Sequence, residues 1–540
     1  MWKKRDDCSN VRSVVERNTK MTSEEFLNPK KNPHLDKLEE TVAFIKSKVE
    51  EKMPITIIGD YDVDGVSSSA ILFLMFKELG IVPKVIIPRR FSDGYGVSTG
   101  LVDKVDSGLL ITVDNGIAAV DAIEYAKAKG LSVVIIDHHL LPEGELPNAD
   151  IILDPHVNEE KSEFCDYCGA GLSFRLACEL IDNRELLKKL LSLAAIGTIA
   201  DVMPLIGDNR RIVKSGLKQI NDGNVTAGLA ALLKQGGFDY IDETSVGFFL
   251  APILNAAGRL KDSGSTRSFQ LLASESNDIN KLREWANAFI SLNNNRKGLV
   301  SAAIDKIEEK MKVNGIAIDK SICLYDPDFQ EGVIGIIAGK LAEQHKCPCI
   351  IFTDGPDNTL KGSARSYGEL NIKSLLDNIS DTMVAYGGHA GAAGLTVDKD
   401  RYLEFKSAFE SECKKCNCSN NESSETNYYD LDVKEEQVDS VFSELQKYAP
   451  FGEGNDRIIV KISKFKPTPN KYGDRIRFFG TENQHVRIFG RYNTVVAFNL
   501  ADKFETLENT NYFDLYATIS LNVYKGKESI QLTAEDIEDC

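Results

Sequence analysis

The chain has 540 residues, of which 42% are hydrophobic and 27% are charged, close to the average for globular proteins. These values exclude wholesale disorder, collagen-like repeats and a small disulfide scaffold, and the length predicts several domains with cores of their own. The net charge of -17 argues against a protein that coats nucleic acid by bulk positive charge alone.

The sequence predicts a cytoplasmic protein with no membrane partner. The longest apolar run, residues 190–200, is interrupted by Ser192, Gly197 and Thr198 and is too short to cross a bilayer. No apolar segment follows the charges of the amino terminus, so we expect no secretory signal. The 11 cysteines are an odd number in a large chain, which is typical of reduced intracellular thiols.

Two groups of cysteines have the tight spacing of zinc ligands. They are Cys165 with Cys168, and Cys413 with Cys416 and Cys418. Free thiols in polar loops are the favoured interpretation, and zinc binding is the alternative that the sequence leaves open.

In chain order, residues 1–49 are predicted to form a helical segment. From residue 54, short apolar runs alternate with helical stretches such as 67–79 and 118–129. Near-continuous apolar strands separated by helices are typical of a parallel sheet that is covered on both faces. The predicted strands are residues 55–58, 85–87, 109–113, 133–136 and 151–153. The fold class is therefore α/β, with a doubly wound parallel sheet.

The remainder of the chain divides into three further patterns. Residues 169–310 are predicted to be mostly helical, and a second, smaller β/α segment then extends to about residue 412. A polar stretch, 413–427, has the composition of a linker. Beyond it, short β-like runs without a long helix between them predict a small barrel or sandwich.

Four short polar stretches each follow an apolar strand or a buried helical run. Because the carboxyl ends of parallel strands share one crevice, these stretches are expected to converge although they lie far apart in the sequence. Their acidic and histidine residues are Asp60, Asp62 and Asp64; Asp114; Asp137, His138 and His139; and Asp201.

Crowded carboxylates repel one another, and ionising all of them in one cleft is costly unless cations compensate. Carboxylates with one or two imidazoles suit divalent metals, and the histidines favour manganese over magnesium, which remains the alternative. Two such ions about 4 Å apart can activate a water and clamp both oxygens of an in-line phosphoryl displacement. The sequence therefore predicts a site for two divalent cations.

Each stretch also has a purely structural interpretation. The segment 60–65 alone could be a helix-capping turn or a calcium-type loop, and the segment 114–116 alone could be a simple turn. Asp201 alone carries no information. Two of only 7 histidines stand side by side at a predicted strand end, and four such stretches at four element boundaries favour the metal site.

These residues resemble the four motifs of the DHH phosphoesterase superfamily. The resemblance extends to segments that look like the RecJ branch, its DHHA1 domain and the entry to its OB-fold, and it spans roughly residues 20–540. The segments are 255–259, 332–336, 361–366, 387–394 and 450–455. Two departures from the family pattern are Phe329-Gln330-Glu331, where RecJ proteins commonly have Trp-His-Pro, and Asp154-Pro155-His156, where many have Asn-Pro.

The resemblance implies a DHH domain, a long connecting helix, a smaller α/β DHHA1 domain and a C-terminal β-barrel of the OB type. The expected boundaries after the N-terminal segment 1–49 are 50–285 for the DHH domain, 286–312 for the connecting helix, 313–412 for the DHHA1 domain, 413–427 for the linker and 428–540 for the OB-fold.

The implied activity is exonucleolytic cleavage of single-stranded DNA, from 5′ to 3′, in DNA repair, recombination or replication. By the resemblance, Asp114 bridges two metal ions, Asp60 supports the first motif, Asp137 orients a histidine, and His139 contacts the scissile phosphate. The implied metal ligands are Asp62, Asp64, Asp114, His138 and Asp201.

Several residues are candidates for holding the substrate. The glycine-rich segment that contains Gly388 and His389 is expected to form a loop whose backbone N–H groups cradle a phosphate. Arginines offer further phosphate contacts, and an aromatic ring offers a stacking face. The candidates outside that segment are Arg89, Tyr95, Arg259, Ser363 and Arg365. Ordinary ion pairs, exposed loops and close-packed turns are the structural alternatives.

The C-terminal part has a local excess of positive charge. Between Asp456 and Arg491, nine Lys or Arg residues oppose three acids, and aromatic residues are interleaved with them. This pattern is typical of a platform on which bases stack and phosphates pair, although about half of the aromatics are expected to be core. The candidate contacts are Lys471, Arg475 and Arg477.

Three other functions are weighed against a single-strand DNA exonuclease. The first is the same chemistry on RNA, short oligonucleotides or cyclic dinucleotides, with either polarity. The second is a replisome scaffold with little catalysis, which has no use for clustered carboxylates. The third is a manganese pyrophosphatase, against which the OB-like domain argues. The sequence leaves open the polarity, the sugar preference, the metal used in the cell, the oligomeric state and any replication or repair partner.

Overall fold

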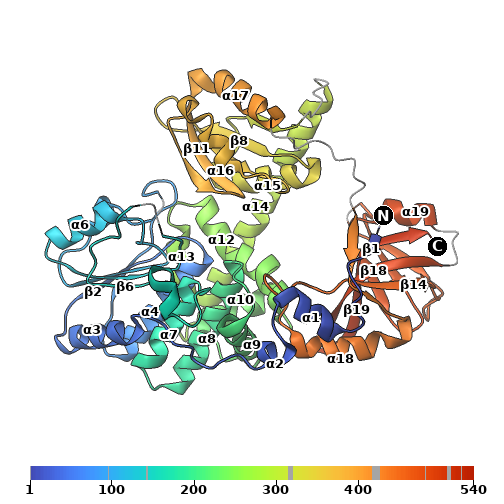
Figure 1. Cartoon of the computed structure of the whole chain (residues 1–540), viewed down its shortest axis with the longest axis horizontal. Helices are drawn as coiled ribbons and strands as arrows, with labels where there is room; N and C mark the ends of the chain where they lie inside the picture. Colours follow the sequence, from blue (N-terminus) through green and yellow to red (C-terminus); the bar gives the residue numbers. More distant parts are fainter. Residues whose placement is uncertain are drawn as a thin grey trace.

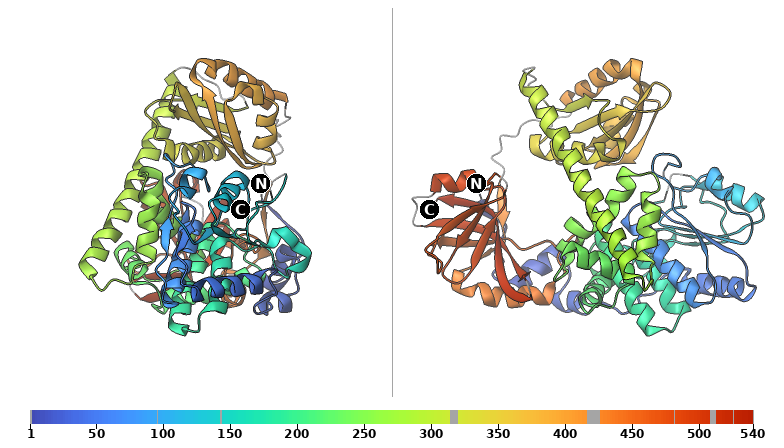
Figure 2. Two further views of the ribbon diagram at one scale, coloured as in Figure 1. Left: turned by 90° about the vertical axis from the view of Figure 1, so that its left-hand side faces the viewer. Right: turned by 180° about the vertical axis from the view of Figure 1, so that it is seen from behind.

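The computed structural model describes residues 2–94, 96–141, 144–313, 320–415, 426–480, 482–507, 512–524 and 526–539. Three domains are visible in Figure 1, where α14 (Ile279–Val313) leads from the first domain to the second. The view from behind in Figure 2 shows this long helix in front of both domains. The third domain lies to the right of the first domain in Figure 1. The two domains are in contact through α9 (Gly207–Asn221) and α18 (Val438–Tyr448), where Arg210 donates a hydrogen bond to the Lys447 carbonyl oxygen.

The first domain is built on a five-stranded parallel sheet in the order β3-β2-β4-β5-β6. The strands β2 and β4 are buried along their whole length, because helices cover both faces. All five predicted strands are confirmed: β2 (Ile55–Ile58), β3 (Lys84–Ile86), β4 (Leu109–Val113), β5 (Ser132–Ile136) and β6 (Ile151–Leu153).

The strand order places the topological switch point between β2 and β4. In doubly wound sheets, ligands bind outside the carboxyl ends of the strands at this point. One face of the sheet is covered by α4 (Val63–Glu78), which packs against α7 (Gly169–Leu180) and α8 (Arg184–Ala200). The other face is covered by α5 (Thr99–Val102) and α6 (Val120–Ala128). Further helices complete the domain: α3 (Leu38–Glu50), α10 (Ala227–Gly236), α12 (Ala251–Leu260) and α13 (Gly264–Leu272).

The second domain has a mixed five-stranded sheet in the order β10-β11-β9-β8-β7. The strands β7 (Ile322–Tyr325) and β8 (Cys349–Asp354) are parallel and are connected by α15 (Glu331–His345), as predicted. The glycine-rich segment 387–394, expected as a loop, instead forms most of an antiparallel hairpin. The remaining elements are β9 (Thr359–Arg365), α16 (Ile372–Asp377), β10 (Ala385–His389), β11 (Ala392–Asp398) and α17 (Tyr402–Lys415).

The third domain is a seven-stranded sheet in the order β13-β14-β18-β19-β17-β16-β15. Its core contains Phe465, Phe513 and Leu532, and α18 packs against it. The strands are β13 (Leu431–Asp432), β14 (Val460–Phe465), β15 (Ile476–Phe479), β16 (His485–Phe489), β17 (Thr494–Ala497), β18 (Phe513–Tyr524) and β19 (Lys527–Asp539).

The N-terminal residues pack against this third domain rather than forming only helices. The strand β1 (Trp2–Lys4) pairs in parallel with β12 (Asn427–Tyr429). The Trp2 ring stacks on Tyr516 at 4.5 Å between centroids, and its indole N–H donates to Asp536 Oδ2 at 2.9 Å. The helices α1 (Val11–Thr19) and α2 (Ser23–Leu27) contribute to the same core. Both chain ends therefore lie in one part of the molecule (Figure 1).

The cysteine groups give no zinc site among the described residues. Cys168 is buried at the N-cap of α7, and Cys413 is buried in the core of the second domain. Cys416 and Cys418 lie outside the described residues. Every group of potential metal ligands found in the described part of the chain belongs to the first domain and contains no cysteine. None of the described helices has the length and apolar character of a membrane span.

Candidate metal centre and phosphate-binding residues

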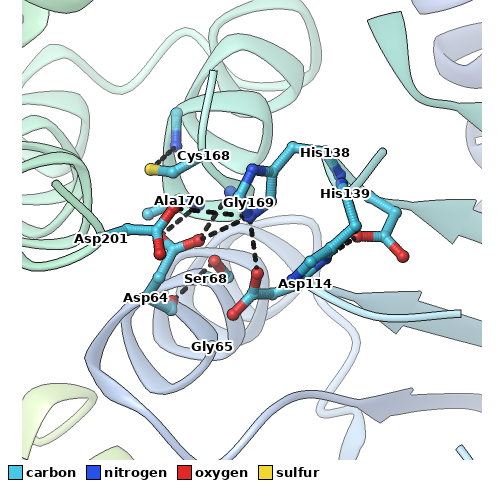
Figure 3. Close-up of polar contacts among 12 residues, drawn as sticks. Asp64, Gly65, Ser68, Asp114, His138, His139, Cys168, Gly169, Ala170 and Asp201 are labelled. Atoms are coloured by element: carbon cyan, nitrogen blue, oxygen red, sulfur yellow. Dashed lines mark hydrogen bonds and ion pairs between the residues drawn. The ribbon is translucent and has the colours of Figure 1, made fainter. Parts of the chain in front are cut away.

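The four polar stretches meet at the carboxyl end of the parallel sheet, as predicted. Asp60 follows β2, Asp114 follows β4, His138 follows β5, and Asp201 caps the carboxyl end of α8. Figure 3 shows the His138 ring among the carboxylates of Asp64, Asp114 and Asp201.

The first motif is shaped by the start of α4. The Asp62 carboxylate is the N-cap of this helix and accepts the Gly65 N–H at 3.0 Å. A Cβ atom on Gly65 would lie 2.7 Å from Cα of Asp60, so only glycine allows the turn to pack on the helix. The motif thus brings Asp60, Asp62 and Asp64 to one end of α4.

Asp64 is anchored by the start of a second helix. Its Oδ2 atom accepts the Gly169 N–H at 2.7 Å, and its Oδ1 atom accepts the Ala170 N–H at 2.9 Å. The amino terminus of α7 therefore stabilises this buried carboxylate. A Cβ atom on Gly197 of α8 would lie 2.6 Å from Asp64 Oδ1, so this glycine leaves room for the carboxylate.

His138 is central to the cluster. Its Nε2 atom lies 3.0 Å from Asp114 Oδ1, 3.6 Å from Asp201 Oδ2 and 3.8 Å from Asp64 Oδ2. Burial lowers the pKa of His138 below its ordinary value, which favours the neutral imidazole. A neutral imidazole among carboxylates has the lone pair that a metal ligand needs.

Asp137 and His139 form a pair beside this cluster, in which Asp137 is buried and the His139 side chain is 44% exposed. Asp137 Oδ1 lies 2.7 Å from His139 Nδ1, while its Oδ2 atom accepts the Ile117 N–H at 2.9 Å. Burial opposes the charged forms of both groups, but the hydrogen bond between them outweighs it. The pKa of Asp137 is therefore lowered, and the pKa of His139 is raised to about 9. The pair with Asp137 thus favours the imidazolium form of His139 at neutral pH when no metal is bound.

The remaining carboxylates are crowded. Burial, followed by the neighbouring carboxylates, raises the pKa of Asp60, Asp62 and Asp114, and it raises the pKa of Asp201 to about 8. Asp60 Oδ1 is buried, and no described residue gives it a hydrogen bond. Ionising all of these carboxylates together is costly unless a positive charge compensates them.

The donor set fits divalent cations. Ligating atoms come within 4.8 Å of one another in three groups, and Asp114 belongs to two of them. Asp60 also belongs to one of the groups; the resemblance implies that it supports the first motif, either as an outer ligand or from behind the ligands. The groups are Asp60 with Asp62 and Asp114; Asp64 with His138 and Asp201; and Asp114 with His138 and His139. Oxygen and imidazole ligands in this combination suit manganese or magnesium.

Four arginines lie close to one another, and two of them, Arg90 and Arg259, also interact electrostatically with carboxylates of the first motif. Burial, followed by the charges of Arg90, Arg296 and Arg365, lowers the pKa of Arg259 to about 10. The Arg90 guanidinium lies 4.0 Å from the centroid of the Tyr61 ring, and its buried Nε atom has no hydrogen-bond partner among the described residues. Buried like charges with spare donors form a site for an anion such as phosphate.

The sequence finds two of these four arginines. Arg259 lies on α12 and Arg365 ends β9, where its Nη1 atom donates to Ser363 Oγ at 3.1 Å. The candidate taken from the sequence is the exposed Arg89 and not its neighbour Arg90, because sequence alone does not show which of two adjacent arginines turns inward. Arg296 was missed because it lies on α14, away from every motif.

The other substrate candidates of the second domain lie on the glycine-rich hairpin. Gly388 has φ +153°, and a Cβ atom there would lie 2.3 Å from the Ala392 carbonyl oxygen, so the hairpin requires glycine. His389 is exposed at the hairpin end, where its Nδ1 atom accepts the Gly391 N–H at 3.2 Å. Tyr95 lies outside the described residues.

The candidates in the third domain are exposed. Lys471 and Arg475 precede β15, and Arg477 on β15 faces Arg487 on β16. The Arg487 guanidinium lies 5.7 Å from the centroid of the Phe479 ring. Like charges opposite one another destabilise a sheet unless an anion compensates. Asp474 already pairs with Arg477, and a phosphate of a bound strand could add to this compensation at Arg487.

Three family models match successive parts of the chain. The model described as the DHH family, N-terminal domain, matches residues 54–198; the DHHA1 domain model matches 318–415; and the RecJ OB domain model matches 429–536. The "Single-stranded-DNA-specific exonuclease RecJ" of Escherichia coli is 33% identical over 402 residues, which is 69% of each chain. The chain belongs to the RecJ family.

Further RecJ proteins cover more of the chain. The Bacillus subtilis RecJ is 31% identical over 516 residues, which is 92% of this chain and 63% of that protein. The crystal structure of Thermus thermophilus RecJ with Mn²⁺ matches with a TM-score of 0.80 and 25% identity, over 98% of this chain and 76% of that chain. The expected fold class is thereby confirmed. The protein is a hydrolase of phosphodiester bonds that depends on divalent metal ions.

Proposed function

We propose that this protein degrades single-stranded DNA from the 5′ end with two divalent cations, manganese being preferred over magnesium. The observation that carries the proposal is the position of Asp114, which belongs to two groups of potential ligands in a cluster whose first motif lies near Arg90 and Arg259. The names of the curated relatives supply the substrate, and the Mn²⁺ and Mg²⁺ titles of related structures support the metals.

The ligands divide into two sets around Asp114. One cation would be held by Asp60, Asp62 and Asp114, and the other by Asp64, His138 and Asp201. Asp114 Oδ1 lies 3.0 Å from Nε2 of His138, a member of the second set, so Asp114 could serve both cations. When bound, two such ions supply an activated water and charge neutralisation at the reacting phosphate.

The chain itself orients and neutralises the substrate. Asp137 fixes the orientation of His139 and keeps it cationic, so His139 can donate a hydrogen bond to an oxygen of the scissile phosphate. Arg90, Arg259 and Arg365 would hold a further phosphate on the 5′ side, which limits cleavage to the strand end. Arg296 adds charge to the same group. The exposed cations of the third domain would hold the rest of the strand.

The test is a time course on single-stranded DNA and RNA that are labelled separately at the 5′ and 3′ ends. It is run with manganese, with magnesium and with a chelator. Early release of the 5′ label from DNA, only with metal, is expected. Early release of the 3′ label would overturn the polarity, and equal rates on RNA would overturn the sugar preference. Complete inactivity of folded, metal-loaded protein would favour a replisome scaffold.

Binding to replication or repair proteins remains a prediction.

A further inference from the structure

A groove lies between the metal centre and the third domain. Its volume is about 340 Å³, and its lining includes Ala200 and Val202, the two neighbours of Asp201 in the chain. The lining comes from the segment that follows Asp201, from the π-helical turn η2 (Val246–Leu250) with the residues before it, and from the start of the third domain. The residues that argue for a function are Val202, Met203, Phe248, Phe451 and Arg457.

The apolar side chains of this groove are unusually exposed. Phe248 is 72% exposed and Val202 is 65% exposed, although both are large hydrophobic residues. Val202 also has φ +57°, a conformation that a β-branched residue rarely adopts. A strained, exposed valine directly after a predicted metal ligand indicates a functional position. The π-helical turn that carries Phe248 is likewise a feature that is frequent at functional sites.

The groove is a fixed part of the junction between the two domains. The Leu205 N–H donates to the Glu453 carbonyl oxygen at 2.7 Å, and the Phe451 N–H donates to Glu243 Oε1 at 3.3 Å. Arg457 donates to the Thr244 hydroxyl across the same junction. These bonds hold the segment after Asp201 against the start of the third domain, so the groove lies at the junction of the two domains, next to the end of α8 that carries Asp201.

We infer that this groove binds an unpaired nucleobase of the strand, stacked on Phe248 and Phe451 with Val202 at its edge. The inference rests on the proposed function, because a strand held by both sites must cross the junction between them. Aromatic faces suit every base, and the exposed Arg457 can pair with the adjoining phosphate. Bases within a duplex are already stacked and paired, so the groove favours single strands.

The matched variants are Phe248→Ala and Phe249→Ala. Both rings belong to η2 and are exposed, but only Phe248 lines the groove. Each is combined with Asp114→Asn, which prevents cleavage, and the Kd for fluorescent single-stranded DNA is measured by anisotropy. Phe248→Ala is expected to weaken binding about fivefold or more, Phe249→Ala less than about twofold, and Phe248→Trp to restore binding.

A set of DNA strands, each with an abasic nucleotide at a different position, identifies the base that occupies the groove. An abasic nucleotide at one position is expected to weaken binding to the Asp114→Asn protein but to add nothing in the Phe248→Ala background, because both changes remove the same stacking interaction. The inference would be overturned if every abasic position had the same affinity, or if Phe248→Ala and Phe249→Ala lost affinity equally. Either result could occur while the unchanged protein still degrades single strands. Absence of single-strand degradation by the unchanged protein would instead overturn the proposed function.

Discussion

Nε2 of His138 lies 3.0 Å from Oδ1 of Asp114 and thereby joins the end of β5 to the end of β4. Asp114 also belongs to the ligand group formed by Asp60 and Asp62 on the other side. Asp114 thus lies within reach of both halves of the acidic cluster, which supports the proposal that it serves both metal ions.

Asp114→Asn is expected to lower kcat by about 10³-fold or more, because it removes the charge shared by both metal positions. Asparagine is the suitable replacement, because Asp114 has φ +59° and asparagine tolerates that conformation better than alanine. Single-strand binding is expected to change little. The measurement is turnover of end-labelled DNA together with anisotropy; the exposed Asp106→Asn is the control. Turnover at the unchanged rate would contradict the site assignment.

Gly197→Ala is expected to reduce both metal-dependent turnover and stability. The added methyl group would lie 2.6 Å from Asp64 Oδ1 and 2.5 Å from Ala170 Cβ, so either the carboxylate or α7 must move. Overpacking of this kind costs about 1–3 kcal/mol of unfolding free energy.

Gly298→Ala on α14 is the matched control, because a Cβ atom there meets nothing within 4 Å. Alanine in an exposed helix stabilises by about 0.5–1 kcal/mol relative to glycine. Thermal denaturation and turnover are measured for both variants, and the two melting temperatures should move in opposite directions. Equal melting temperatures and equal turnover in the two variants would contradict the tight packing around Asp64.

Arg365→Ala is expected to raise KM about tenfold or more for a strand with a 5′ phosphate, and less for a strand with a 5′ hydroxyl. A charge-assisted hydrogen bond to phosphate is worth about 1.5–3 kcal/mol, and Arg365 is one of four arginines that share this region. Arg401→Ala is the control, because this exposed arginine of the second domain pairs with Glu404. A uniform rise in KM on both substrates would argue against a terminal-phosphate site.

The sequence could predict the elements and residues whose signals are local. The apolar runs around Ile55–Ile58 and Leu109–Val113 predict buried strands, and polar residues directly after them predict one shared edge. Contacts between distant segments had no such signal. Asp64 binds N–H groups more than 100 positions away, and Trp2 pairs with a strand beyond residue 426. The glycines of 387–394 predict an open loop, whereas the pairing of β10 with β11 makes the segment a hairpin, and the pairing of β11 with β9 joins this hairpin to the sheet.

Arg477→Gln with Arg487→Gln is expected to weaken binding of long single strands without slowing hydrolysis of a dinucleotide. The two guanidinium groups face one another across β15 and β16, and Arg477 also pairs with Asp474. Replacing both arginines removes two cations that are expected to neutralise phosphates of the bound strand. The slope of log Kd against log salt concentration should fall by about 0.7 for each phosphate that is no longer neutralised. Lys46→Gln on α3, an exposed change in the first domain, should leave the slope unchanged. An unaltered slope in the double variant would show that the strand takes another path past the third domain.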